Sequence, residues 1–159
     1  MMSIRDSRWI AVIFVTGLAI SATMVARSQV AGDQLNLLSL GWLLAEEGVW
    51  IPYGNPTTGA GPTPGGASSI VVGLPLMLWK HHRAPVLFIW LGHLVAYWML
   101  DRWLRRILTP EERLVFAVLY WLNPWRLYFS GHIWNLNLLF LVGAAHFWSA
   151  YRLSTPCSS

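Results

Sequence analysis

The stretch WIAVIFVTGLAISATMVA, residues 9–26, runs for 18 positions without a charged side chain. As an α-helix it rises about 27 Å, close to the roughly 30 Å thickness of a bilayer's hydrocarbon core. The sequence therefore predicts a membrane-spanning helix here. Asp33 follows within a few residues, so its carboxylate is expected just beyond the membrane surface.

The composition of the whole chain agrees with this placement. The 159 residues are 55% hydrophobic and 11% charged, with a mean hydropathy of +0.47, which is outside the usual range of soluble domains. The apolar residues come in blocks separated by short polar strips, and many of the 11 Trp lie near block ends, where amphipathic rings favour the headgroup level. The predicted fold class is all-α: a polytopic transmembrane helical protein.

The positive charge is explained by its position rather than by nucleic-acid binding. The net charge is +4, but Arg5 and Arg8 precede the first apolar block and four more arginines lie in DRWLRRILTPEER, residues 101–113. Such strips are typical of cytoplasmic loops under the positive-inside rule. The expected partners are therefore membrane lipids and neighbouring membrane helices, with no nucleic acid.

Four segments are long enough to cross a membrane, which predicts a single membrane domain over residues 1–159. They are residues 9–26, 84–100, 114–129 and 133–151. This arrangement places the N-terminus and the loop 101–113 in the cytoplasm and the loop 27–83 outside. Two alternatives remain: a fifth span, which would move the arginine-rich loop outside, and a secretory signal peptide cleaved after Ala26.

The long outer loop is expected to carry helices that lie at the membrane interface. Residues 33–47 have an amphipathic helical pattern with Gly48 as a C-terminal stop. Residues 70–79, IVVGLPLMLW, are too short to cross and contain Gly73 and Pro75, so a surface-lying or re-entrant segment is predicted. Between them, the Gly and Pro density of residues 52–66 predicts no regular structure, and suits a mobile lid or a linker.

Asp33 is the strongest candidate for a chemical role. A partly desolvated carboxylate at the membrane boundary can act as a general base toward a hydroxyl group. The structural alternative is that Asp33 caps the helix that follows it. Asn separates the two roles, because it caps nearly as well but cannot accept a proton.

Other candidate binding residues lie later in the outer loop. Glu46 and Glu47 fall at the helix C-terminus, where negative charge opposes the macrodipole, so a cationic ligand, a sugar or the basic strip beyond could compensate them. Solvated glutamates are the alternative. The strip from Lys80 to Arg83 could grip a phosphate or simply anchor to headgroups, and its adjacent His81 and His82 lack further ligands for a metal.

The segment LNPWRLYFSGHIWNLN, residues 122–137, gathers polar side chains around an outer turn. Polar residues at membrane depth are costly and tend to face a cavity or a partner, so Arg126, His132 and Asn135 are expected to share an outer pocket with Asp33. Snorkelling of Arg126 and ordinary interhelical hydrogen bonds of the asparagines are the alternative. His93 and His146, within spans, are expected to be packed rather than catalytic.

Together these features resemble the polytopic GT-C glycosyltransferases, which take a sugar from a polyprenyl-phosphate carrier outside the cytoplasm. The matching features are a first span, a long outer loop that opens with Gly32-Asp33, surface-lying helices in that loop, and a second outer loop after the third span. The run NPWRLYFSGHIWNLNLL, residues 123–139, is similar to a stretch of dolichyl-phosphate-glucose-dependent members and of bacterial mannosyl- and aminoarabinose-transferase relatives. The resemblance covers the front part of the family module.

The resemblance implies an inverting transfer in a bacterial cytoplasmic membrane, with the N-terminus inside. Asp33 would be the base, His132 and Asn135 would line its pocket, and Lys80, Arg83 or Arg126 would meet the charge of the leaving phosphate. Gln34 follows Asp33 and SGHIWNLN holds no carboxylate, whereas many relatives carry a second acid at one of these places, so neither a metal nor another cofactor is expected. The alternative is a non-catalytic membrane fragment or a small subunit of a membrane complex.

Overall fold

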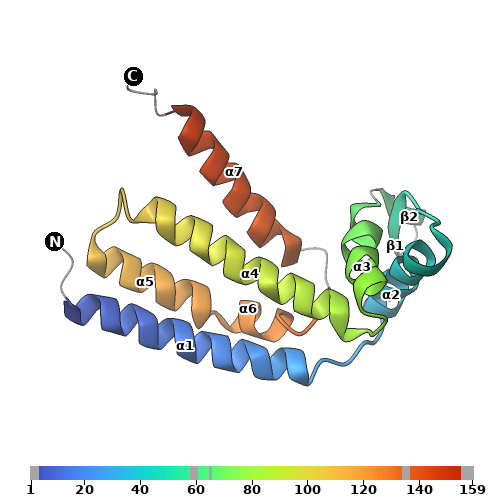
Figure 1. The fold of residues 1–159 in the computed structure, drawn as a ribbon, viewed down its shortest axis with the longest axis horizontal. Helices are drawn as coiled ribbons and strands as arrows, with labels where there is room; N and C mark the ends of the chain where they lie inside the picture. The colour runs from blue at the N-terminus through green and yellow to red at the C-terminus, as the bar shows by residue number, and fades with distance from the viewer. Residues whose placement is uncertain (1–3, 58–60, 65, 134–136, 155–159) are drawn as a thin grey trace.

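The computed structural model describes residues 4–57, 61–64, 66–133 and 137–154, and its fold is predominantly helical, as predicted (Figure 1). Two short strands and one π-helical turn accompany the α-helices. The elements in chain order are α1 (Ile4–Ala26), α2 (Asp33–Trp42), η1 (Leu43–Glu47), β1 (Tyr53–Thr57), β2 (Gly61–Pro64), α3 (Ala67–Leu78), α4 (Arg83–Leu104), α5 (Pro110–Trp121), α6 (Pro124–Phe129) and α7 (Leu138–Ser154).

The helices form a bundle with a smaller group of elements at one end. α1, α4 and α5 lie side by side, and α7 packs on α4 and leans away from the other two (Figure 1). The start of α1, the turn between α4 and α5 and the end of α7 lie at one end of the bundle. α2, α3 and the two strands lie at the opposite end. This layout places every element of the long loop on one side of the bundle.

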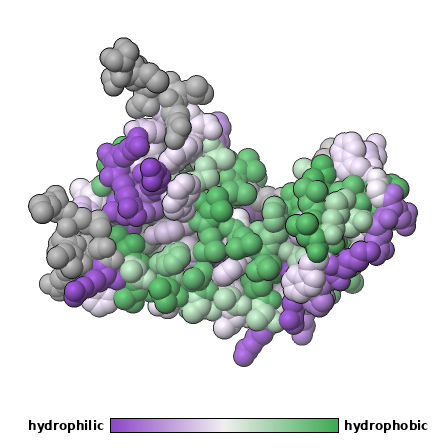
Figure 2. All heavy atoms as spheres, viewed as in Figure 1, coloured by the Kyte–Doolittle hydropathy of each residue, from purple (hydrophilic) through white to green (hydrophobic). Residues whose placement is uncertain are grey.

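Two helices are long and apolar enough to cross a membrane within the described residues, Arg8–Ala26 of α1 and all of α4. Much of the bundle surface is apolar as well: Val15 of α1 is 59% exposed, Leu119 of α5 64% and Val142 of α7 61%. Figure 2 shows hydrophobic residues over the middle of the bundle and hydrophilic residues toward its ends. Burial inside the described part of the protein therefore does not account for these exposed apolar side chains of α1, α5 and α7.

The segment 114–129, predicted as one helix, is divided into α5 and α6. α5 begins at Pro110 behind a capping box, in which Thr109 and Glu112 satisfy each other's backbone N–H groups. It ends at Trp121 because Pro124 has no N–H to continue the helix. The Asn123 side chain then accepts hydrogen bonds from the N–H groups of Trp125 and Arg126, at 2.9 and 3.2 Å, and starts α6 as a separate short helix.

The predicted helix over residues 33–47 is present as α2 and η1, and it ends where Gly48 adopts a φ of 68°. Its apolar face packs on α3. Leu37 is buried against this neighbour, and Gly41 approaches so closely that a Cβ there would lie 2.5 Å from Val72 Cγ1. The helix α3 continues without a break through Gly73 and Pro75. The expectation that these two residues disturb it is therefore wrong.

Residues 52–66 contain a short hairpin, which corrects the prediction of no regular structure. β1 and β2 pair antiparallel, with Tyr53 opposite Pro64 and Thr57 opposite Gly61, and the register is irregular between Tyr53 and Pro56. Proline is tolerated in a two-stranded sheet because each strand has one edge that needs no partner. The Gly and Pro composition therefore limits the length of the strands without preventing their pairing.

Candidate functional site

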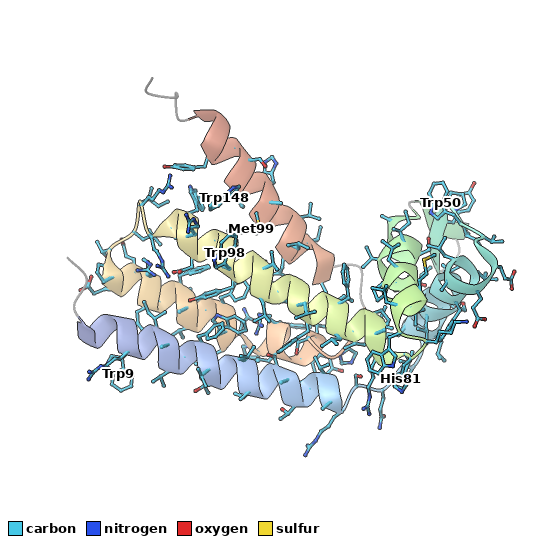
Figure 3. The ribbon with its side chains drawn as sticks, in the orientation of Figure 1. Trp9, Trp50, His81, Trp98, Met99 and Trp148 are labelled. Carbon is cyan, nitrogen blue, oxygen red and sulfur yellow. The ribbon has the colours of Figure 1, made fainter. Side chains whose placement is uncertain are left out.

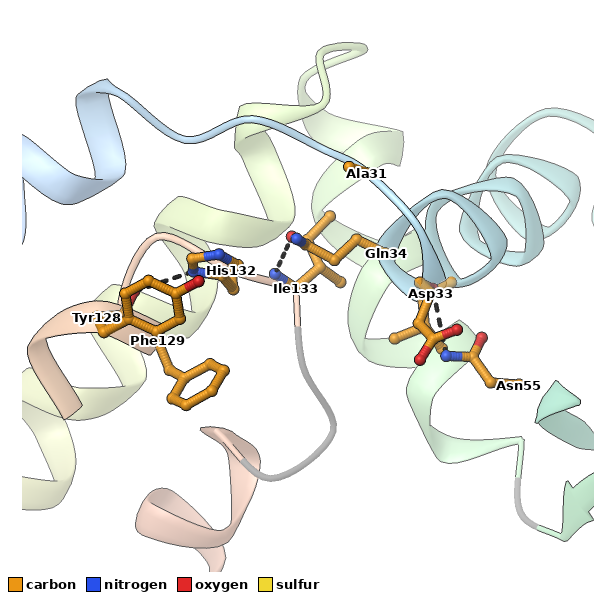
Figure 4. A pocket seen from close by; sticks show the side chains of 9 residues that line it. Ala31, Asp33, Gln34, Asn55, Tyr128, Phe129, His132 and Ile133 are labelled. Carbon is orange, nitrogen blue, oxygen red and sulfur yellow. Dashed lines mark hydrogen bonds between the residues drawn. The ribbon is translucent and has the colours of Figure 1, made fainter. Parts of the chain in front are cut away.

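The start of α2 and the turn after α6 enclose a cavity of about 570 Å³ at the end of the bundle that carries the long loop (Figure 4). Asp33 and His132 both line this cavity. The remaining lining residues come from the same two regions and from β1: Ala31, Gln34, Leu37, Asn55, Tyr128, Phe129 and Ile133. Two residues that are 99 positions apart in sequence thus contribute to one concave surface.

Two hydrogen bonds hold the walls of this cavity together. The N–H of Ile133 donates to the Gln34 side-chain oxygen at 2.9 Å, which joins α2 to the turn after α6. The Asn55 side-chain amide donates to the Asp33 carbonyl oxygen at 3.2 Å, which joins the hairpin to the start of α2 (Figure 4). Both bonds use the backbone of one partner, so they fix the position of the chain rather than the chemistry of the pocket.

Capping does not account for Asp33 in this structure. Gly32, with a φ of 55°, occupies the cap position of α2, and no side chain caps this helix. Asp33 is instead the first helical residue and is exposed. Its negative charge there is favourable with respect to the helix dipole, and its carboxylate remains at the cavity wall.

His132 is oriented by the backbone of α6. Its ring Nδ1 lies 2.9 Å from the Tyr128 carbonyl oxygen, and because a carbonyl can only accept, Nδ1 carries the proton. In the neutral imidazole the lone pair is therefore on Nε2. The ring also packs on Tyr128, with centroids 4.8 Å apart, and the Asn137 amide donates to the His132 carbonyl oxygen at 3.0 Å. The turn is thus braced on both sides of the imidazole.

Arg126 does not join this cavity. Its residue is 3% exposed, and its guanidinium lies over the rings of Trp121 and Tyr120, at 4.2 and 5.1 Å from their centroids. The guanidinium nitrogens make no hydrogen bond in the described part of the chain. The expectation that Arg126 lies at the outer turn with His132 is therefore wrong, and so is the alternative of snorkelling. Asn135 lies outside the described residues.

The remaining predicted binding residues lie elsewhere at the same end of the bundle. Lys80 Nζ is 3.8 Å from Glu46 Oε1, and both side chains are more than half exposed. The basic strip therefore compensates the charge of Glu46, which is one of the alternatives given above for the glutamates at the helix C-terminus. Glu47 is exposed at the end of η1. Arg83 lines a separate apolar groove of about 270 Å³ with Trp90 and residues of α1.

The histidines between Lys80 and Arg83 pack on one another and on Trp79. The His81 ring stacks on Trp79 at 5.0 Å and contacts the His82 ring at 4.3 Å. Partial burial, followed by the charges of His81 and Arg83, lowers the pKa of His82. Protonation of His82 is therefore less favourable than that of a free histidine.

Three of the cavity's lining residues with polar side chains, Gln34, Asn55 and Tyr128, were not singled out by the sequence as site residues. Gln34 adjoins Asp33 and Tyr128 lies one helical turn before His132, so proximity to a predicted residue was a usable signal for both. Asn55 lies in the Gly- and Pro-rich segment, and no local pattern marks it. Its role depends on where the hairpin packs.

No group of three potential metal ligands comes together among the residues that the structure describes. Searches of protein-family models, curated proteins and solved structures found no match to this chain. The resemblance described above therefore depends on the motifs quoted for it.

Proposed function

We propose that this chain is an integral membrane glycosyltransferase of the GT-C type, which transfers a sugar from a polyprenyl-phosphate carrier on the extracytoplasmic side. One observation carries the proposal. Asp33 and His132, which the resemblance selects as pocket residues, line one cavity at the same end of the bundle.

A four-span membrane arrangement fits the course of the chain. The four crossings are α1, α4, the pair of α5 and α6, and α7. The arginines between α4 and α5 then lie on the cytoplasmic side, together with the start of α1 and the end of α7 (Figure 1). The cavity then lies at the outer surface. Exposed apolar side chains on α1, α5 and α7 face lipid in this arrangement.

The reaction is a single displacement at the anomeric carbon. The Asp33 carboxylate takes the proton of an acceptor hydroxyl, and the hydroxyl oxygen attacks the anomeric carbon. The bond from that carbon to the carrier phosphate breaks with inversion, and the phosphate leaves with the electron pair. Asp33 suits this role because its carboxylate makes no hydrogen bond or ion pair among the described residues and faces a cavity large enough for a sugar.

His132 and the basic strip would bind the polar parts of the substrates. The Nε2 of His132 accepts a hydrogen bond from a hydroxyl when neutral, or donates one to a phosphate oxygen when protonated. Arg83 lies in an apolar groove beside Trp90, an environment that suits a phosphate attached to a hydrocarbon chain. Arg126 is too enclosed to share this role and is withdrawn from it.

The decisive experiment measures sugar transfer by the reconstituted protein. Proteoliposomes receive radiolabelled polyprenyl-phosphate sugars and candidate acceptors, and labelled product is counted. We expect Asp33→Asn to abolish transfer while the helical circular dichroism and the elution volume in detergent stay unchanged. The matched control is Glu111→Gln, an exposed carboxylate at the opposite end of the bundle, which should retain full transfer. Retained transfer by Asp33→Asn would refute the base assignment.

A further inference from the structure

One outward stripe of α4 is apolar along its length and ends in an arginine. Leu91, Val95 and Trp98 are 45%, 46% and 59% exposed, and their spacing places them with Arg102 on a single face of the helix. The buried residues of α4, such as His93 and Tyr97, occupy the other side. About half of the surface of each of these three residues stays uncovered by the described part of the bundle, although Trp98 also contacts Trp148 of α7.

Two cations at the end of this stripe have no acidic partner. In the described part of the chain, neither Arg102 nor Arg106 makes an ion pair, because the Asp101 carboxylate is engaged by Arg105 and Arg113. Arg102 lies 5.9 Å from the Trp98 ring centroid, and Arg106 lies 5.2 Å from that of Tyr151. Aromatic faces thus position both guanidinium groups and leave their charge unneutralised.

α7 supplies a fixed aromatic edge beside these arginines. The Trp148 ring stacks on Trp98 with centroids 6.3 Å apart, and the two side chains point toward each other between α4 and α7 (Figure 3). The Tyr151 hydroxyl accepts a hydrogen bond from Arg106 at 2.9 Å. Because these contacts join two helices, Arg106 is held in place relative to the α4 stripe.

We propose that this surface binds one anionic phospholipid, with the headgroup phosphate between Arg102 and Arg106 and an acyl chain along Leu91, Val95 and Trp98. The binding is independent of the glycosyltransferase chemistry, since the turn between α4 and α5, where the two arginines hold the headgroup, lies at the bundle end opposite the Asp33 cavity. An apolar stripe with two cations at its end is complementary to an amphiphile. An acyl chain would bury the apolar area of the stripe, and a phosphate would form charge-assisted hydrogen bonds with the arginines.

The apolar stripe distinguishes this occupant from a soluble anion. Inorganic phosphate would meet the same two arginines but would leave Leu91, Val95 and Trp98 exposed. A lipid joins both parts, so its affinity must depend on the headgroup charge and on the length of the chain. The alternative is that the two arginines only stabilise the C-terminal end of α4 through the helix dipole. In that case lipid affinity would depend neither on the headgroup charge nor on the length of the chain.

The test is native mass spectrometry of the detergent-purified protein, with phosphatidylglycerol and phosphatidylcholine of identical chains. We expect wild-type protein to retain phosphatidylglycerol preferentially, and the variant Arg102→Gln/Arg106→Gln to bind it about 30-fold more weakly, the effect of losing two surface arginines. The matched control is Arg27→Gln, which removes one exposed arginine from the far end of α1 and should bind as the wild type does.

Several outcomes would overturn the proposal. The first three are measured on wild-type protein and so do not depend on whether a variant folds. Equal retention of the two lipids would exclude a headgroup site. Equal affinity for phosphatidylglycerols with short and long acyl chains would exclude the apolar stripe. Displacement of the lipid by millimolar inorganic phosphate would identify a soluble-anion site instead. Unchanged affinity in the double variant, or an equal loss in Arg27→Gln, would show that Arg102 and Arg106 are not the determinants.

Discussion

The buried carboxylate of Asp101 is expected to be the most sensitive single group for the stability of the bundle. One of its oxygens accepts hydrogen bonds from the Nε and a terminal nitrogen of Arg113, at 3.2 and 2.7 Å. The other accepts two from Arg105, at 2.9 and 2.7 Å. This carboxylate therefore joins the end of α4 to the start of α5.

The two arginines differ in what they would lose if the carboxylate were neutralised. The Arg113 side chain is 6% exposed and cannot recover its solvation in water, whereas the Arg105 side chain is 62% exposed. Removing one partner of a buried ion pair costs about 3–5 kcal/mol. At about 2–4 °C per kcal/mol for a chain of this size, Asp101→Asn should lower the melting temperature by about 6–20 °C.

Thermal unfolding in one detergent, followed by circular dichroism, measures this effect. Arg105→Gln is the matched control, because loss of the exposed partner should cost at most about 1 kcal/mol. Asp101→Leu/Arg113→Met, which removes both buried charges together, should recover most of the loss. The reasoning from desolvation would be refuted if Asp101→Asn and Arg105→Gln had the same melting temperature. It would also be refuted if the double variant had the lowest melting temperature of the three.

Further predictions concern helix contacts and one titrating cap. Gly17→Ala should destabilise the protein by about 1–3 kcal/mol, because the new Cβ would lie 2.6 Å from Trp121 Cβ and 2.7 Å from its carbonyl oxygen. Gly143→Ala, with open space around it, should stabilise slightly in the same thermal assay. Hydrogen bonds from Thr109 lower the pKa of Glu112 below 4.5, so this carboxylate stabilises the fold above that pH and ceases to do so as pH falls through the lowered value. The stability difference between wild type and Glu112→Gln should therefore be largest near neutral pH and shrink as the pH falls through the lowered pKa of Glu112; a difference that does not change with pH would contradict the cap.

Local patterns predicted the helices whose formation depends on their own residues. The charge-free run in α1 and the long apolar block in α4 are visible without knowledge of any partner. The same holds for α2 and η1, where Gly48 provides the left-handed C-terminal residue. These elements could be located because helical periodicity and termination are encoded within a few turns of sequence.

Features that depend on distant segments could not be located in this way. The hairpin needs a pairing register between β1 and β2 that composition does not specify. Arg126 was expected beside His132, but the break at Asn123 and Pro124 directs the start of α6 so that its guanidinium enters the bundle against Trp121. A one-residue change in where a helix begins rotates each following side chain by about 100°, and the sequence does not reveal that choice.

The cavity separates residues that build its walls from residues that remain available for chemistry. Gln34 and Asn55 use their side chains on backbone groups, and His132 uses Nδ1 in the same way. These bonds leave at the wall the Asp33 carboxylate, the Nε2 of His132 and the Tyr128 hydroxyl. The first two are able to accept a proton and to bind a hydroxyl or phosphate oxygen. If the cavity were only a packing defect, there would be no reason for the bonded groups to orient the backbone while the titratable ones stay unengaged. That division is the physical argument for testing Asp33 before any other residue.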